Sequence, residues 1–114
     1  MVNRNKNVSY VDQVSIDYIE AVKELNDLDW TYKNNGISFF NLKNGDNVFC
    51  NRQGENKWFV LTRVMKDGVY TGYQWASYPD HESLINTIRL FFEDGDWFHS
   101  LHWDMIKWKS DFSR

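Results

Sequence analysis

The sequence predicts a single α+β domain in which helices flank an antiparallel β-meander of four to five strands, at about residues 30–77. Three observations support this fold class. Apolar residues recur every three or four positions before residue 30, they alternate between turn dipeptides from 30 to 77, and the helical spacing returns after Pro79. A chain of 114 residues has the usual size of a domain with one core. We expect residues 1–8 to form a flexible tail and 9–114 to form the domain, without an internal linker.

Composition narrows the class of protein further. Six Trp, six Tyr and eight Phe within a hydrophobic fraction of 42% predict an aromatic core. A formal net charge of −3 does not indicate a polyanionic or polycationic partner. Cys50 is the single cysteine, and neither a leader nor an apolar run of ~20 residues is recognisable. We therefore expect a cytoplasmic protein, in the host cell if it is phage-encoded.

The first helix is expected to start near Tyr10 and to end near Leu28. Its apolar residues recur on one helical face, and Ser9 followed by Asp12 is a short-armed version of a capping box. The residues of that face are Val11, Val14, Tyr18, Ala21, Val22 and Leu25.

The meander is predicted from turn dipeptides between alternating apolar segments. Asn35-Gly36 and Asn44-Gly45 favour type I′ hairpin turns, in which both central residues need positive φ. A three-residue loop over 66–68 would pair Met65 with Val69. That register defines a core face and a second face, and the second face is more apolar than a solvent-exposed face should be. The core face would hold Phe59, Leu61, Met65, Val69, Tyr73 and Trp75, and the second face Trp58, Val60, Thr62, Val64, Tyr70 and Gln74.

One or two helices are predicted to follow the meander. Ser77 or Asp80 would cap the first, Pro79 would lie in its first turn, and Gly95 would end it. Its apolar positions are Leu84, Ile85, Ile88, Phe91 and Phe92. We expect a second helix over residues 96–108, although the alternation of Trp97, Leu101, Trp103 and Met105 also suits a strand.

No residue pattern predicts an enzyme. His99 and His102 are weak candidates for metal ligands, because a closed site also needs ligands from elsewhere in the chain. Cys50 lies in a predicted strand, where a cysteine is usually a small buried hydrophobe. The glycines are single and each serves a turn, so no phosphate-binding loop is present. We expect no cofactor and no catalysis.

An acidic row on the first helix is the most suggestive functional feature. Four carboxylates recur at three and four residues, opposite the apolar face, and Lys23 is the one cation near them in the sequence. Such a row can imitate phosphates toward the basic cleft of a nucleic-acid-binding enzyme. The row consists of Asp17, Glu20, Glu24 and Asp27.

Basic and aromatic residues in the sheet support an alternative hypothesis. Rings can stack on bases while cations neutralise phosphates, which is what single-stranded nucleic acid needs. The candidate residues are Lys57, Trp58, Arg63, Lys66 and Tyr70. The hairpin and helix over residues 57–92, about a third of the chain, also resemble the sheet-and-helix unit of arm-type DNA-binding domains of phage integrases. No residue roles follow from this resemblance.

The sequence thus predicts a non-enzymatic macromolecule-binding domain, monomeric or homodimeric. The main hypothesis is a phage or mobile-element accessory protein that inhibits a host nucleic-acid-binding enzyme through the acidic helix face. The alternative is a single-stranded nucleic-acid binder that uses the sheet. What covers the second sheet face should decide between these two hypotheses.

Overall fold

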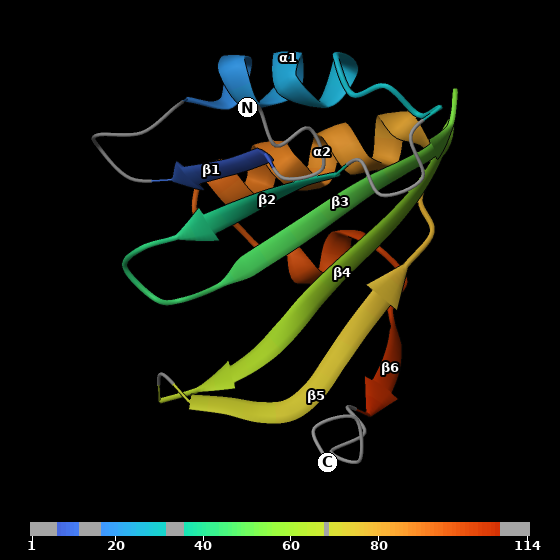
Figure 1. Cartoon of the computed structure of the whole chain (residues 1–114). Helices are drawn as coiled ribbons and strands as arrows, with labels where there is room; N and C mark the ends of the chain where they lie inside the picture. Colours follow the sequence, from blue (N-terminus) through green and yellow to red (C-terminus); the bar gives the residue numbers. More distant parts are fainter. Residues whose placement is uncertain (1–6, 12–16, 32–35, 68, 108–114) are drawn as a thin grey trace, which may run out of the picture.

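A computed structural model describes residues 7–11, 17–31, 36–67 and 69–107. One six-stranded sheet in the order β1-β2-β3-β4-β5-β6 forms one layer, and two α-helices form the other (Figure 1). The elements are β1 Asn7–Val11, α1 Tyr18–Asn26, β2 Gly36–Asn41, β3 Asn47–Gly54, β4 Lys57–Lys66, β5 Val69–Ser77, α2 His81–Phe92, the 3₁₀ helix η1 Phe98–Ser100 and β6 Asp104–Lys107. The α+β class is therefore confirmed. Within the described residues, no helix is long and apolar enough to cross a membrane.

The N-terminal region contains a strand that the sequence analysis missed. β1 pairs with β2 in parallel, and α1 makes the crossover that such a pair requires. The helix expected from near Tyr10 begins at Tyr18 instead, and Tyr10 itself pairs with Phe40. The tail expected over residues 1–8 overlaps this strand, because Asn7 and Val8 are the first two residues of β1. The expected helical residue Val14 lies outside the described residues.

The meander from β2 to β5 is antiparallel, as predicted, but the predicted register of its last hairpin is wrong. Lys66 pairs with Val69, so the loop has two residues rather than three. Farther along, Arg63 pairs with Gln74 across a bulge, where Gly72 has a φ of 90°. A shift by an odd number of residues turns every side chain of a strand to the opposite face.

In β4 the buried residues are consequently those expected on the second face, whereas Trp75 of β5, expected on the core face, pairs with Thr62 and does pack against the core. Trp58, Val60 and Thr62 are buried under the helices, whereas Phe59 and Leu61 lie half-buried on the other side of the sheet. On this outer face the Phe49 ring fills the space above Gly36, where a Cβ would lie 2.7 Å from the ring. The helices of the chain thus cover the sheet face that carries Trp58, Val60 and Thr62, which the sequence analysis had left undecided.

The turn types also differ from the prediction. Gly45 has a φ of 83°, but Asp67 and Asp94 are the non-glycine residues with positive φ in the described part of the chain. Asn44 therefore does not share a type I′ turn with Gly45, and its carboxamide accepts from the backbone N–H of Asp46 at 2.8 Å instead. Asn35, the other predicted turn residue, lies outside the described residues.

The helix α2 confirms the prediction closely. Asp80 is its N-cap and accepts from the backbone N–H of Ser83 at 2.8 Å, whereas Pro79, expected in the first turn, precedes the cap. At the other end Asp94 has a φ of 61°, and the N–H of Gly95 donates to Leu90 O at 2.8 Å. This is a Schellman motif with aspartate in the left-handed position.

The second C-terminal helix is not formed. The chain makes the short η1 and then β6, which pairs with β5 and extends the sheet. The indole N–H of Trp103 donates to Phe98 O, and the two rings stack at 5.2 Å between centroids. A strand succeeds here because β5 would otherwise expose a row of unpaired backbone groups. Trp108, the last expected helical residue, is outside the described part.

One core lies between the sheet and the helices. Partly buried rings of β5, α2 and the segment after it extend this core toward one end of the sheet. The core residues are Ala21, Leu25, Leu28, Ile37, Phe39, Val48, Cys50, Trp58, Val60, Leu84, Ile88, Phe91 and Trp103.

Candidate functional site

The predicted acidic residues lie on and around α1, but two of them have structural roles. Asp17 is the N-cap and accepts from the Glu20 backbone N–H at 2.9 Å. Asp27 is the C-cap residue and pairs with Lys23 at 3.2 Å. Asp17, Glu20 and Asp27 are exposed, and Glu24 is half-buried. We call Asp17, Glu20, Glu24 and Asp27 the acidic face.

An apolar side chain lies next to the acidic face. Ile19 is 74% exposed, although it belongs to a helix whose Ala21 and Leu25 are fully buried. Trp30, shortly after the helix, is 46% exposed. These two side chains leave apolar surface beside the charges that a partner protein could contact.

The basic and aromatic residues of the alternative hypothesis are not brought together. Trp58 is 1% exposed and lies in the core, so it cannot stack on a base. Lys57 and Lys66 are the two end residues of the ten-residue β4, roughly 30 Å apart. The remaining pair is close, since the Arg63 guanidinium lies over the Tyr70 ring at 5.4 Å.

The two candidate metal-ligating histidines are paired separately. His99 Nδ1 lies 2.9 Å from Asp96 Oδ1, and the pKa of Asp96 is lowered by these hydrogen bonds from His99. His102 Nε2 lies 3.4 Å from Asp104 Oδ1. Among the described residues no three His, Cys, Asp or Glu side chains converge on a point.

The thiol of Cys50 is fully buried in the core. Burial raises its pKa far above the ordinary value, because the thiolate would lose its hydration. A nucleophilic cysteine needs the thiolate form, so Cys50 is built as a core residue.

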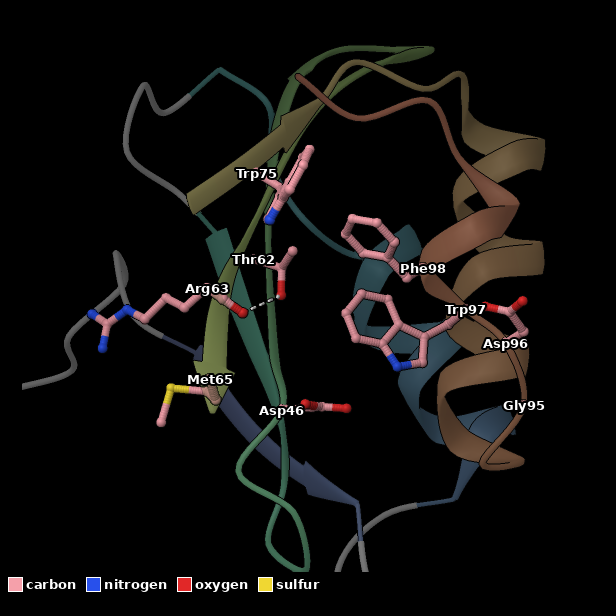
Figure 2. A pocket seen from close by; sticks show the side chains of 9 residues that line it. All are labelled: Asp46, Thr62, Arg63, Met65, Trp75, Gly95, Asp96, Trp97 and Phe98. Carbon is pink, nitrogen blue, oxygen red and sulfur yellow. Dashed lines mark hydrogen bonds between the residues drawn. The ribbon is translucent and has the colours of Figure 1, made fainter. Parts of the chain in front are cut away.

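A cavity of about 380 Å³ opens between the sheet and the segment that follows α2 (Figure 2). We call it the aromatic cavity. Its lining comes from the β2–β3 loop, β4, β5 and the segment through η1. The lining residues are Asp46, Thr62, Arg63, Met65, Trp75, Gly95, Asp96, Trp97 and Phe98.

Two acidic residues belong to this lining, of which Asp96 is exposed and Asp46 is half-buried. The pKa of Asp46 is raised above the ordinary value mainly by burial and further by the nearby charge of Asp94, while a hydrogen bond from the Trp97 side chain acts in the opposite direction. Figure 2 shows the Asp46 carboxylate on the same side of the sheet as Trp97 and Phe98, whereas Arg63 and Met65 extend away from the cavity. The cavity thus combines aromatic walls with one half-buried carboxylate.

A second cavity, of about 310 Å³, lies between the end of β5 and the segment before β6. Ser77, Ser100 and His102 are among its lining residues. The Ser100 hydroxyl is already engaged, because it donates to Trp97 O at 2.6 Å and lies 2.6 Å from the Thr87 hydroxyl. It is therefore not poised as a nucleophile.

The aromatic cavity was missed by sequence reasoning. Asp46, Trp75 and Trp97 come from three segments that meet through the register of the sheet and through the turn after α2. The one local signal was the pair Trp97-Phe98 directly after a helix stop.

Comparisons with protein-family models, curated proteins and solved structures found no match.

Proposed function

We propose that this chain is a non-enzymatic binding domain that attaches to a basic surface of a partner protein through the acidic face of α1. The observation that carries the proposal is the exposed position of Asp17, Glu20 and Asp27 beside the exposed Ile19. Residues 17–27 span roughly 15 Å along a helix, enough for several cationic side chains of a partner to be engaged at once.

The proposed partner is a nucleic-acid-binding enzyme. Such enzymes hold phosphates in clefts lined by Lys and Arg, and a row of carboxylates on a rigid helix presents the same sign of charge. By occupying the cleft, the domain would exclude the nucleic acid. A phage or mobile-element accessory protein in the host cytoplasm fits this role, and the fully buried thiol of Cys50 fits a reducing compartment.

Charge reversal of the acidic face tests the proposal. The variant combines Asp17→Asn, Glu20→Lys and Glu24→Lys, because asparagine keeps the N-cap of α1 while it removes the charge. The matched control combines Asp67→Asn, Glu55→Lys and Glu82→Lys, which changes the formal charge equally on exposed residues elsewhere. Asparagine also tolerates the positive φ of Asp67.

Affinity capture from the cells that produce the protein, followed by quantitative mass spectrometry, gives the partner. We expect the acidic-face variant to retain at least about tenfold less of it than the control variant does. The purified partner should then release fluorescent duplex DNA when wild-type protein is added. Equal retention by both variants would remove the acidic face from the proposal.

A second candidate function rests on the Arg63–Tyr70 contact at 5.4 Å, which pairs a cation with a half-buried ring on the β4–β5 hairpin. A base of single-stranded nucleic acid would stack on the ring there while the guanidinium contacts a phosphate. Titration of a fluorescent single-stranded oligonucleotide at low salt tests this, since phosphate contacts are strongest there. The function is excluded if no binding occurs at tens of micromolar protein.

A further inference from the structure

The walls of the aromatic cavity are rings set at right angles to one another. Trp75 and Phe98 meet at an interplanar angle of 85° with centroids 5.4 Å apart, and Trp97 meets Phe98 at 80° and 5.9 Å. Each ring is only partly buried and packs against the core. Although Trp103 stacks on Phe98, parts of all three rings, from β5, from η1 and from Trp97 just before η1, border one space (Figure 2).

The charge around this space is negative. Asp46 lines the cavity and Asp94 is near enough to act on it electrostatically, whereas the Asp96 side chain points away from the cavity in Figure 2 and pairs with His99. The cationic lining residue, Arg63, extends away from the cavity in Figure 2, and its guanidinium lies over Tyr70 instead. Aromatic faces and carboxylates both attract cations, so the two features favour the same class of ligand.

The geometry also selects among cations. A guanidinium binds best through two parallel hydrogen bonds to a carboxylate, whereas this cavity offers mainly ring surface with one half-buried carboxylate. A metal ion needs several converging ligands, and no group of three was found among the described residues. A rounded alkylammonium needs only ring surface and a nearby negative charge. In this cavity the three perpendicular rings provide the ring surface and Asp46 provides the charge.

We propose that the aromatic cavity is a binding site for an alkylated ammonium group, which contacts Trp75, Trp97 and Phe98 and is balanced by Asp46. A cavity of about 380 Å³ lies toward the lower end of the ~300–1,000 Å³ usual for ligand pockets, which suits a compact head group. This site is separate from the acidic face, so either proposal can fail without the other.

Choline and its neutral isostere 3,3-dimethyl-1-butanol test the proposal, because they share shape and differ in charge. Both are titrated at constant ionic strength into ¹⁵N-labelled protein, and the indole N–H signals of Trp75 and Trp97 are followed by NMR. We expect choline to shift both signals and to bind at least about tenfold more tightly than the neutral alcohol. Equal affinities, or no shift at tens of millimolar choline, would overturn the proposal.

Two variants locate the site. Asp46→Asn keeps an oxygen that can accept from Trp97 but removes the charge, and it should weaken choline binding by about tenfold without changing the weak binding of the alcohol. Phe98→Leu keeps apolar volume but removes the ring, and it should also weaken choline binding. Glu55→Gln, in the distant β3–β4 turn, should leave it unchanged. Wild-type affinity in both Asp46→Asn and Phe98→Leu would refute the site.

A short peptide containing trimethyl-lysine distinguishes the source of the ammonium group. Tighter binding of this peptide than of choline, with no binding of the unmethylated peptide, identifies a modified protein side chain. Equal affinities of the methylated peptide and choline identify a small-molecule head group. Preference for the unmethylated lysine over both methylated probes would contradict the proposed chemistry.

Discussion

Near each end of β4 an arginine lies 5.4 Å from an aromatic ring, Arg52 from the neighbouring β3 and Arg63 from β4 itself, yet the two arginines have different surroundings. At the β3–β4 turn, which we call the closed end, Arg52 lies over the buried Trp58 and donates to four backbone carbonyls. At the open end, beside the aromatic cavity, Arg63 lies over Tyr70 and is exposed. Both arginines lie at the same distance from a ring, and what distinguishes Arg52 is that it also donates to backbone carbonyls.

The closed end joins three elements. Arg52 Nη1 donates to Asn26 O and Leu28 O, the otherwise free carbonyls at the C-terminus of α1. The Asn56 side chain accepts from the backbone N–H of His81, in the first turn of α2, at 2.7 Å. One turn of the sheet therefore holds an end of each helix, while the open end leaves rings and a carboxylate facing a cavity.

Replacement of the two arginines should give the largest effect. Arg52→Ala should lower the free energy of unfolding by about 2–4 kcal/mol, because several carbonyls lose a charged donor and Trp58 loses its cover. Arg63→Ala should cost less than about 1 kcal/mol. Arg52→Lys keeps the charge without the planar fork and should recover little. Urea denaturation measures all three, and equal losses for the two alanine variants would contradict the distinction.

The helix cap beside the closed end should have a smaller effect. Asp80→Ala should cost about 1 kcal/mol, because the backbone N–H of Ser83 loses its acceptor. Hydrogen bonds from Ser83 lower the pKa of Asp80, so the capping contribution should be full above pH ~4 and lost as the pH falls further. Asp80→Asn should retain most of the stability at neutral pH. Thermal unfolding at pH 7 and pH 3 compares these variants.

His81 adds a pH dependence to the closed end. Burial and the Arg52 charge lower its pKa, although Asp80 acts in the opposite direction. Protonation therefore favours the unfolded chain, and stability should fall as the pH drops below ~6.5, the ordinary value. His81→Gln should flatten the pH dependence of the free energy of unfolding, measured by urea denaturation between pH 7.5 and 5.5. An unchanged slope in His81→Gln would assign the effect to other groups.

The smallest effect is expected on the exposed surface of α1. Lys23 and Asp27 pair at 3.2 Å with both side chains largely in solvent. Lys23→Ala should change the free energy of unfolding by less than about 0.5 kcal/mol. A loss comparable to that of Arg52→Ala would mean that the acidic face has a structural role, and its proposed function would then need separate support.

Local signals predicted α2 correctly because its cap, apolar spacing and stop all lie within a few residues of one another. Asp80, Leu84 and Gly95 each act over one helical turn. The α+β class and the hairpins of the meander were likewise accessible, since they follow from alternation and turn residues. Non-local pairing was not accessible, and for that reason β1 was missed and the strand at β6 was only the alternative to an expected helix.

The face of β4 shows how a small local error spreads. Assigning Lys66 to the loop rather than to the strand shifted the expected pairing by one residue. The expected register grouped Phe59 and Trp75 on the core face and left Trp58 on the second face as a ring for stacking, although Trp75 pairs with Thr62 and Trp58 is a core residue. The acidic face needed no tertiary information, because its spacing alone defines it. The aromatic cavity required the true register, and so it could not be predicted.

Because the Cys50 thiol is completely buried, the rate at which it reacts can measure how often the core opens. A thiol reagent can reach this sulfur only when the sheet and helices separate, so the rate of labelling at saturating reagent would report how often the core opens. The same measurement after addition of choline or a captured partner would show whether either one slows that opening. A single native atom thus permits the two proposed sites to be compared without any fluorescent tag.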